Sequence, residues 1–292
     1  MTRTVTTADG RSLAVREGGI PGGVPVIAHH GTPGAGLLYA PHVLDAEAKG
    51  IHLLSYDRPG YGDSTRHEGR AVADCAADVA AIADAYGYER FCTWGISGGG
   101  PHALAVAALL PDRCAAAAAL APVAPWNAEG LDYFEGMGED NVHEFDLALN
   151  DPDGHRRALD DSRVLLSEGG SDAFAEAFAS LLPPVDAAAL RGPLGAYIGE
   201  SFSVGVGAGV DGWFDDDAAF VAPWGFDLGA IEVPVLHWQG RHDRMVPWGH
   251  GVWLAEHIAG VESRLDEDEG HLTLLARRVP DAHDWLVERF DR

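Results

Sequence analysis

A short apolar stretch that passes through a glycine-flanked serine into a second apolar stretch constrains this chain more than any other feature. Residues 91–96 have the composition of a buried strand, Ser97 and three glycines follow, and residues 101–110 predict a helix. The Gly-x-Ser-x-Gly pattern predicts a tight strand-to-helix turn, because only small residues fit around such a turn. The turn lifts the serine hydroxyl clear of the sheet. We therefore expect Ser97 to be a nucleophile and the N–H of Gly98 to be an oxyanion donor.

Strand and helix patterns alternate along most of the chain, which predicts an α/β core. Strands are expected at residues 3–7, 12–16, 24–29, 52–56, 91–96, 114–120, 233–240 and 262–265. Between residues 125 and 223 the alternation stops, and helices are expected at 129–149, 153–167, 171–182 and 185–206. A helical block between two strands of one sheet predicts a cap over the carboxyl edge, where open α/β sheets bind ligands. The predicted organisation is a core of residues 1–124 and 225–292 with a helical cap insertion at 125–224.

A serine nucleophile needs a general base and an acid that orients the base. In a chain with this order of elements, both should follow later strands. Asp243 lies a few residues after the strand at 233–240, and His271 follows the last short strand, with a glycine before it and a helix after it. The loop at 121–125, another common place for the acid, contains no carboxylate. We expect Ser97, Asp243 and His271 to form a catalytic triad.

A second loop should face the same pocket. Residues 30–34 (HGTPG) directly follow the strand at 24–29. Gly31 allows the backbone to approach a substrate closely, and the N–H of Thr32 is the predicted second oxyanion donor beside that of Gly98. The side chain of His30 is expected to be a structural hydrogen-bonding group. A plain Gly/Pro turn is the alternative interpretation of this loop.

Apolar residues near these loops predict the pocket. Trp126 is the first candidate for contact with an apolar substrate because it directly follows the sheet, and Gly31, Ile96 and Met245 complete the predicted lining. The alternative for the aromatic residues is an ordinary core role. The cap is rich in acidic residues, and residues 215–217 (DDD) are interpreted as a solvated turn.

Five segments in this order resemble the α/β-hydrolase fold family. They are residues 30–34, 57–64, 95–99, 240–247 and 270–271. The resemblance implies an eight-stranded, mostly parallel sheet flanked by helices, an inserted helical cap, and Ser97, Asp243 and His271 as the triad. It is specific for the catalytic machinery and not for the substrate. Family members that act as epoxide hydrolases or haloalkane dehalogenases use an aspartate nucleophile, so Ser97 argues against those activities.

The expected activity is that of a serine hydrolase that cleaves a small-to-medium carboxylic ester, lactone or related acyl compound through an acyl-enzyme. Relatives with the same triad cleave C–C bonds, hydrolyse amides or peptides, or perform cofactor-free perhydrolysis, and these activities stay open. So does a slow-turnover ligand receptor on the same fold. A proline-type aminopeptidase would need cap carboxylates to hold a substrate ammonium group, for which the candidates are Glu129, Asp132, Glu135 and Glu139.

Composition restricts the partners and the compartment. The net charge of −25 argues against nucleic acids and anionic membrane surfaces. No apolar run reaches the roughly 18 residues of a transmembrane helix, and the first ten residues lack the apolar core of a signal peptide. Cys75, Cys92 and Cys114 lie in apolar settings and predict buried reduced thiols. We expect a cytoplasmic enzyme with a small-molecule substrate, no cofactor and no metal, and a homodimer stays open.

Overall fold

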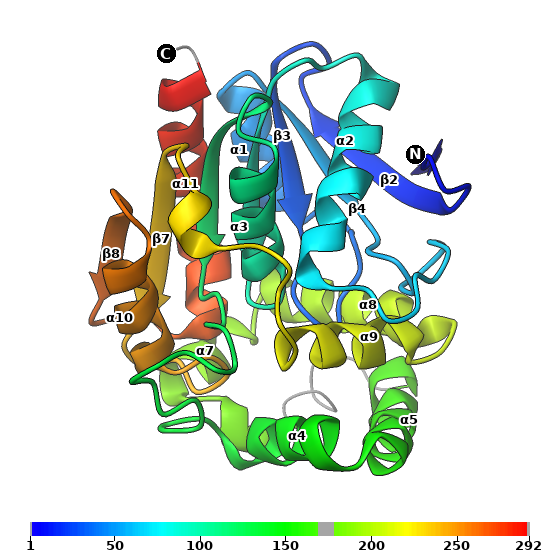
Figure 1. Cartoon of the computed structure of the whole chain (residues 1–292), viewed down its shortest axis with the longest axis vertical. Helices are drawn as coiled ribbons and strands as arrows, with labels where there is room; N and C mark the ends of the chain where they lie inside the picture. Colours follow the sequence, from blue (N-terminus) through cyan, green and yellow to red (C-terminus); the bar gives the residue numbers. More distant parts are fainter. Residues whose placement is uncertain (1, 169–177, 291–292) are drawn as a thin grey trace.

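The computed structural model describes residues 2–168 and 178–290, and an eight-stranded sheet forms its centre (Figure 1). The strand order is β1-β2-β4-β3-β5-β6-β7-β8, and only the β1–β2 and β2–β4 pairs of this sheet are antiparallel. The strands are β1 (Thr2–Thr6), β2 (Ser12–Gly19), β3 (Val24–His29), β4 (Ile51–Tyr56), β5 (Phe91–Ile96), β6 (Cys114–Leu120), β7 (Val235–Gly240) and β8 (Glu262–Asp266). The predicted eight-stranded, mostly parallel sheet is confirmed.

Helices cover both faces of this sheet. The helices that the structure describes, including those outside these faces, are α1 (Ala40–Ala48), α2 (Cys75–Tyr86), α3 (Gly99–Leu109), α4 (Glu139–Asn150), α5 (Pro152–Glu168), α7 (Pro184–Ala189), α8 (Pro193–Gly207), α9 (Asp211–Phe220), α10 (Trp248–His257) and α11 (His271–Phe290). Short 3₁₀ turns lie at Val72–Asp74, Ala179–Leu181 and Leu228–Ala230. Apolar residues of α2, α3 and α10 pack on one face, and those of α1 and α11 pack on the other. None of the helices in the described part of the chain combines the length and apolarity needed to cross a membrane.

In the alanine-rich strand β6, tertiary packing determines the structure and the local helix propensity does not. Five consecutive alanines favour a helix, yet β6 pairs in parallel with β5 and β7 and all its residues are buried. A strand between two others, covered on both faces by helices, must be apolar throughout, and small side chains allow those helices to lie close. The three cysteines are also buried, and none forms a disulfide.

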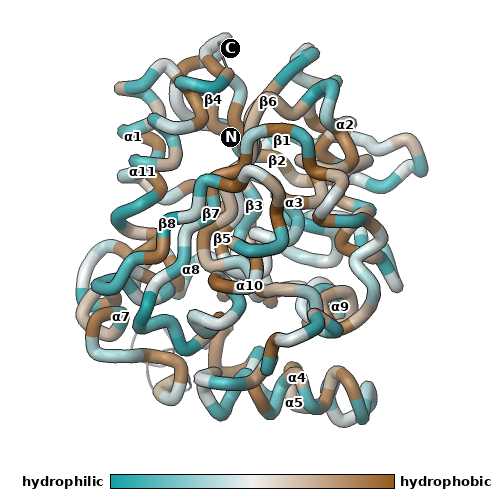
Figure 2. The backbone as a smooth tube through the Cα atoms, turned by 60° about the vertical axis from the view of Figure 1, so that its left-hand side comes forward, coloured by the Kyte–Doolittle hydropathy of each residue, from teal (hydrophilic) through white to brown (hydrophobic). Residues whose placement is uncertain are grey.

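The helices between β6 and β7 gather at the carboxyl end of the sheet (Figure 1). We call residues 125–224 the cap. Two of its helices, α4 and α5, alternate between hydrophilic and hydrophobic residues (Figure 2), as expected for helices with one buried face. Helix α5 matches the helix predicted at 153–167 closely.

Other predictions within the cap were wrong. The helix expected over 129–149 begins only at Glu139, because Gly130 and Gly136 adopt left-handed backbone angles, φ 84° and 86°. The helix expected over 185–206 is divided into α7 and α8, because Pro193 cannot donate the backbone hydrogen bond that would continue α7. The helix expected at 171–182 lies mostly outside the described residues, with a 3₁₀ turn at its end. Residues 215–217 are not a solvated turn, since all three aspartates are buried in α9.

Candidate active site

Ser97 lies at the junction between β5 and α3, in a backbone conformation that is unfavourable for a side-chain-bearing residue. Its φ is 56°, and Ala121 is the only other non-glycine residue with a positive φ among those described. The turn is held by hydrogen bonds on both sides: the Ser97 N–H donates to the Leu120 carbonyl at 2.9 Å, and the Gly100 N–H donates to the Ser97 carbonyl at 2.8 Å. This geometry is that of a nucleophile elbow.

The glycines of the motif are required by close backbone approaches. A Cβ atom at Gly95 would overlap the backbone of Gly99, and one at Gly99 would lie 2.7 Å from the carbonyl oxygen of His30. A Cβ at Gly31 would lie 3.4 Å from the Cβ of Ser97. Strand β5, the elbow and the loop after β3 are therefore pressed together around the serine.

His271 and Asp243 form a buried pair at the start of α11. The His271 Nδ1 atom lies 2.7 Å from Asp243 Oδ2. The other oxygen of Asp243 accepts from the backbone N–H groups of Met245 and Val246, each at 2.8 Å, while Gln239 Nε2 donates to Oδ2 at 3.2 Å. These donors fix the carboxylate, which in turn holds the proton of the imidazole on Nδ1 and leaves Nε2 to accept a proton.

The electrostatics of this pair favour a charged imidazole. Burial alone lowers the pKa of His271, but the charge of Asp243, its hydrogen bond and the charge of Asp186 outweigh burial, so the pKa is raised above its ordinary value. An imidazolium that forms during a reaction would thus be stabilised in place. Ser97 and His271 line the same cavity, and Asp243 lies behind the histidine.

Two backbone N–H groups lie beside the serine. Gly98 is the N-cap of α3, and a Cβ on it would lie 3.0 Å from the Cβ of Thr32, so the two residues are close neighbours. In the parts of the chain that the structure describes, neither the Gly98 nor the Thr32 N–H donates to a protein acceptor. An anion at this end of the cavity would also lie at the N-terminus of α3, where the helix dipole favours negative charge.

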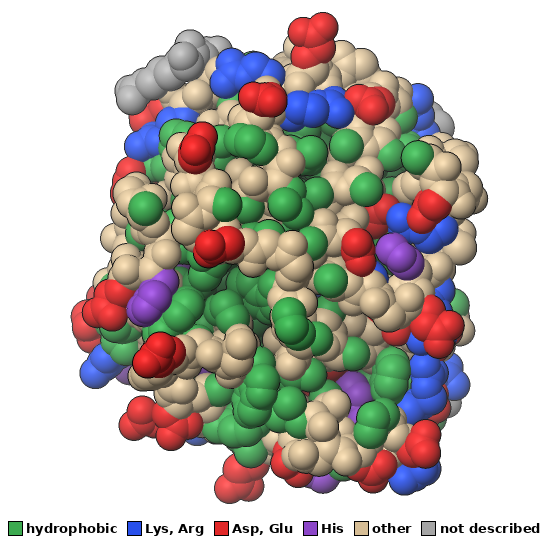
Figure 3. Space-filling model, viewed as in Figure 1, with side chains coloured by type: hydrophobic (Ala, Val, Ile, Leu, Met, Phe, Trp, Pro, Cys, Tyr) green, Lys and Arg blue, Asp and Glu red, His purple; other side chains and the backbone are tan. Residues whose placement is uncertain are grey.

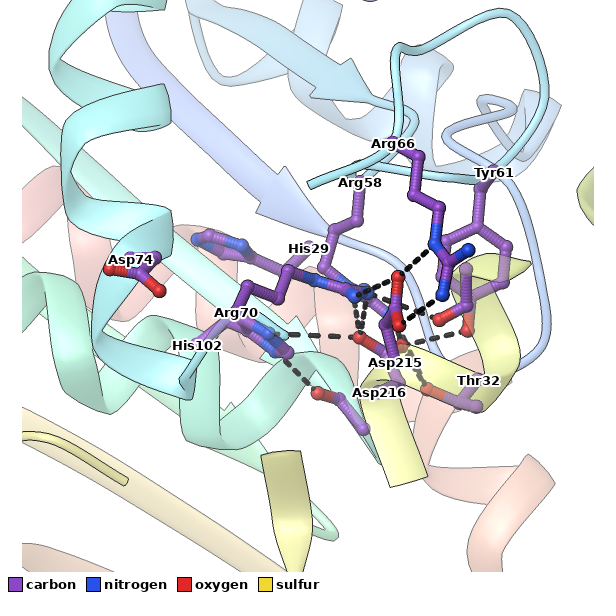
Figure 4. Close-up of polar contacts among 12 residues, drawn as sticks. His29, Thr32, Arg58, Tyr61, Arg66, Arg70, Asp74, His102, Asp215 and Asp216 are labelled. Atoms are coloured by element: carbon purple, nitrogen blue, oxygen red, sulfur yellow. Dashed lines mark hydrogen bonds and ion pairs between the residues drawn. The ribbon is translucent and has the colours of Figure 1, made fainter. Parts of the chain in front are cut away.

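The side chain of Thr32 belongs to a buried ionic network that joins the core to the cap (Figure 4). Its hydroxyl donates to Asp216 Oδ2 at 2.6 Å. The same carboxylate of α9 receives Arg58 Nη2 at 2.6 Å, Arg70 Nη2 at 2.6 Å and the Tyr61 hydroxyl at 2.8 Å. Burial raises the pKa of Asp216, but the two guanidinium groups outweigh it and hold that pKa far below its ordinary range. The predicted oxyanion loop is thus tied to a cap helix.

The predicted pocket residues divide into two groups. Gly31, Ile96 and Met245 line the cavity that contains Ser97. Trp126 is not among the residues that line this cavity: its ring packs against Tyr133 and Phe134, at centroid distances of 4.9 and 5.3 Å, and its contact with a substrate stays a prediction. Its position in the chain next to the sheet did not reveal that the chain turns away from the pocket there.

The four cap carboxylates considered for binding a substrate ammonium group are exposed and do not line the cavity; they are Glu129, Asp132, Glu135 and Glu139. The carboxyl groups that do line it are Glu144 and Asp217. Trp213 Nε1 donates to Glu144 Oε1 at 2.9 Å, and His155 Nε2 lies 3.0 Å from Asp217 Oδ2. Burial, and the negative charge of neighbouring carboxylates, raise the pKa of both groups. Sequence reasoning missed them because acidic residues are common throughout the cap.

A family model described as the alpha/beta hydrolase fold matches residues 24–277. The chain therefore belongs to the alpha/beta hydrolase fold family, as the resemblance of its motifs implied, and it is a hydrolase-class enzyme.

The chain is also similar to individual known proteins, in sequence or in structure. The chain is similar to a non-heme chloroperoxidase of Streptomyces lividans, with 28% identity over 256 residues that cover 84% of this chain and 83% of that protein. It is similar in structure to a thermophilic esterase from Thermogutta terrifontis, with a TM-score of 0.71, 20% identity and 99% of each chain covered. It also resembles the enol-lactonase from Burkholderia xenovorans LB400, with a TM-score of 0.66, 21% identity, and 99% of this chain and 100% of that one covered. At these identities the two structures show a shared fold.

Proposed function

We propose that this enzyme cleaves small-to-medium carboxylic esters, lactones or related acyl compounds with Ser97 as nucleophile. His271 takes the serine proton as the hydroxyl attacks the carbonyl carbon, and Asp243 holds the imidazole and stabilises its charged form. The N–H groups of Gly98 and Thr32 bind the oxyanion. The alcohol leaves with the proton from His271, and the same imidazole then activates water to release the acid from the acyl-enzyme.

The observation that carries this proposal is the arrangement around a single cavity. A strained serine, a histidine whose Nδ1 is held by a buried carboxylate, and two backbone N–H groups without protein acceptors in the described residues all meet there. Each group alone has an ordinary structural explanation. Together they provide a nucleophile, a general base and electrostatic stabilisation of an oxyanion.

The depth of the cavity supports a substrate of limited size. On the face of the sheet that carries α1 and α11, Ala28 and Trp94 line the cavity with 4% and 5% of their surface accessible. Two residues earlier in the same strands, Val26 and Cys92 are fully buried. Leu53, which pairs with Val26 in the sheet, still lines the cavity, so the space below Ser97 extends along about five residues of strand, which limits a substrate branch on that side to a length on the order of 15 Å.

The test is hydrolysis of p-nitrophenyl esters from acetate to decanoate by the wild type and Ser97→Ala. We expect turnover with an optimum at short or medium chains, and a loss in kcat of about 10⁴-fold or more in the variant, because the nucleophile is removed. Circular dichroism should show an unchanged fold. If Ser97→Ala kept a tenth of the wild-type activity, Ser97 would not be the nucleophile.

A second activity, cofactor-free perhydrolysis, is favoured by the similarity to the Streptomyces lividans chloroperoxidase. In this reaction a carboxylic acid forms the acyl-enzyme with loss of water, and hydrogen peroxide replaces water as the attacking group to give a peracid. Incubation of the enzyme with acetate and hydrogen peroxide distinguishes the two activities. Peracid formation that depends on Ser97 would show perhydrolysis. Ester hydrolysis with no peracid formation would show that the enzyme is a hydrolase alone.

A further inference from the structure

A carboxylate of the cap reaches the first turn of the helix that carries His271. Asp186 of α7 is completely buried, and its Oδ2 accepts from the His271 N–H at 2.8 Å. Its Oδ1 accepts from the N–H groups of Leu272 at 2.9 Å and Thr273 at 3.0 Å. The residue that caps α11 therefore lies 85 positions before His271 along the chain, in a different structural segment.

The sequence around the histidine makes room for this carboxylate. A Cβ atom at Gly270 would lie 2.6 Å from the Cγ of Asp186, so any other residue before His271 would displace it. The first N–H groups of a helix have no partner within the helix, and a negative charge near them is stabilised by the helix dipole. Burial raises the pKa of Asp186, but the charge of His271 and the backbone N–H groups oppose that effect, and all three hydrogen-bonding partners are donors, as an ionised carboxylate requires.

We propose that Asp186 is a positioning residue for His271: from the cap, it fixes the first turn of α11 and places a second negative charge beside the imidazole. The cap is then a component of the catalytic apparatus and not only a cover for the substrate. This inference rests on the proposed role of His271 as general base.

Few charged groups besides Asp186 act on the imidazole of His271. Glu269, two residues before the histidine, is turned to Arg278, with 2.8 Å between Oε1 and Nη2. The acidic groups that face His271 or line its cavity from other elements are Asp243, Asp186, Glu144 and Asp217, and the other titratable side chains that line the cavity are His29, His30, His42, Tyr39 and Tyr197. Only Asp243 and Asp186 raise the pKa of the imidazole, against the effect of burial.

The test compares Asp186→Asn with the wild type. Asparagine keeps the shape and one oxygen acceptor, but it removes the charge. We expect kcat for a p-nitrophenyl ester to fall by about tenfold to a hundredfold with little change in KM, because the imidazole is less well positioned. We also expect the acidic limb of the pH–activity profile to move to lower pH. A purely structural role would leave that limb in place.

The matched control is Asp151→Asn. Asp151 is another cap aspartate that receives a backbone N–H at the start of a helix, from Gly154 at 3.0 Å, but it is half exposed and does not line the cavity. Its substitution should leave kcat and the pH profile unchanged. An acidic limb that stays at the wild-type pH in Asp186→Asn, or moves equally in Asp151→Asn, overturns the proposal.

A second readout does not depend on catalysis. The imidazole of His271 can be titrated by NMR, with its resonance identified by its loss in His271→Gln, and its pKa should be lower in Asp186→Asn than in the wild type. An unchanged pKa contradicts the proposal even if no ester is hydrolysed. If Asp186→Asn does not fold, Asp186→Ser supplies a short uncharged acceptor for the same titration. An inactive wild type with a shifted pKa would instead refute only the proposed function.

Discussion

At the scale of the residue, the site depends on groups held in states that they would not adopt alone. Ser97 has a positive φ, which is unfavourable without the close packing that Gly95 and Gly99 permit. His271 is buried, which opposes its charged form, yet the carboxylates beside it reverse that effect. The local strain at the serine and the raised pKa of the histidine are both created by neighbours, so both should respond to changes in those neighbours.

The pH dependence of activity follows from the raised pKa of His271. A general base must be neutral, so activity is lost as pH falls through its pKa. Because that pKa lies above its ordinary value of 6.5, the fall of kcat/KM with decreasing pH should have its midpoint above pH 6.5. In Asp243→Asn, kcat should fall by about 10⁴-fold and the limb should move to lower pH. Rate measurements between pH 5 and 9, on the order of ten points, test this. An acidic limb below pH 6.5 in the wild type would contradict it.

At the scale of the element, α9 is joined to the core by Asp216. This carboxylate is fully buried and is shared by Arg58 of the loop after β4 and by Arg70, which are themselves buried. It also orders the loop that carries Thr32. A buried charge pair is strongly destabilising when one partner is removed, because the other remains without compensation. The helix is thus fixed to the core by charge as well as by apolar packing.

The substitution Asp216→Asn should therefore lower the free energy of unfolding by about 3–5 kcal/mol, since it leaves two buried guanidinium groups underpaired. Urea unfolding followed by circular dichroism measures this. The control is Asp211→Asn at the start of the same helix, whose ion pairs with Arg66 and Arg156 are partly exposed and should contribute about 0–1 kcal/mol. Equal losses in the two variants would show that burial of Asp216 adds nothing.

At the scale of the whole molecule, negative charge dominates. The chain has 45 acidic and 20 basic residues, and acidic side chains are scattered over the face in Figure 3 instead of forming one patch. Dispersed like charges repel one another in the compact state, and salt screens that repulsion. Several acidic residues do not take part in this repulsion because they are buried in ion pairs. Salt screens such buried pairs much less than it screens surface charges.

We expect the melting temperature to rise when NaCl increases from about 10 mM to about 0.5 M at neutral pH, because screening relieves the repulsion among surface carboxylates. Differential scanning calorimetry measures the change, and sorbitol at equal osmolality controls for effects that do not depend on charge. A fall in melting temperature with salt would mean that surface ion pairs stabilise the fold more than repulsion weakens it.

Local sequence patterns determined the core of the fold and the chain positions of the proposed triad. Strands β3, β5 and β6 begin and end at the predicted residues, and the other strands differ by one to three residues at their ends. Apolar periodicity, turn glycines and helix ends are properties of short segments, so they can be recognised without knowledge of the rest of the molecule. The elbow around Ser97 and the loops that carry Asp243 and His271 belong to this group.

Only the tertiary structure decided which acidic side chains matter. Asp186 and Asp216 resemble the exposed carboxylates of the cap in sequence, yet their partners His271 and Arg58 lie 85 and 158 positions away. The same limit applies to Trp126, which is close to the sheet in the chain but outside the cavity. Whether a charged or aromatic side chain is exposed, paired or part of a site depends on which distant segment packs against it, and no local pattern contains that information.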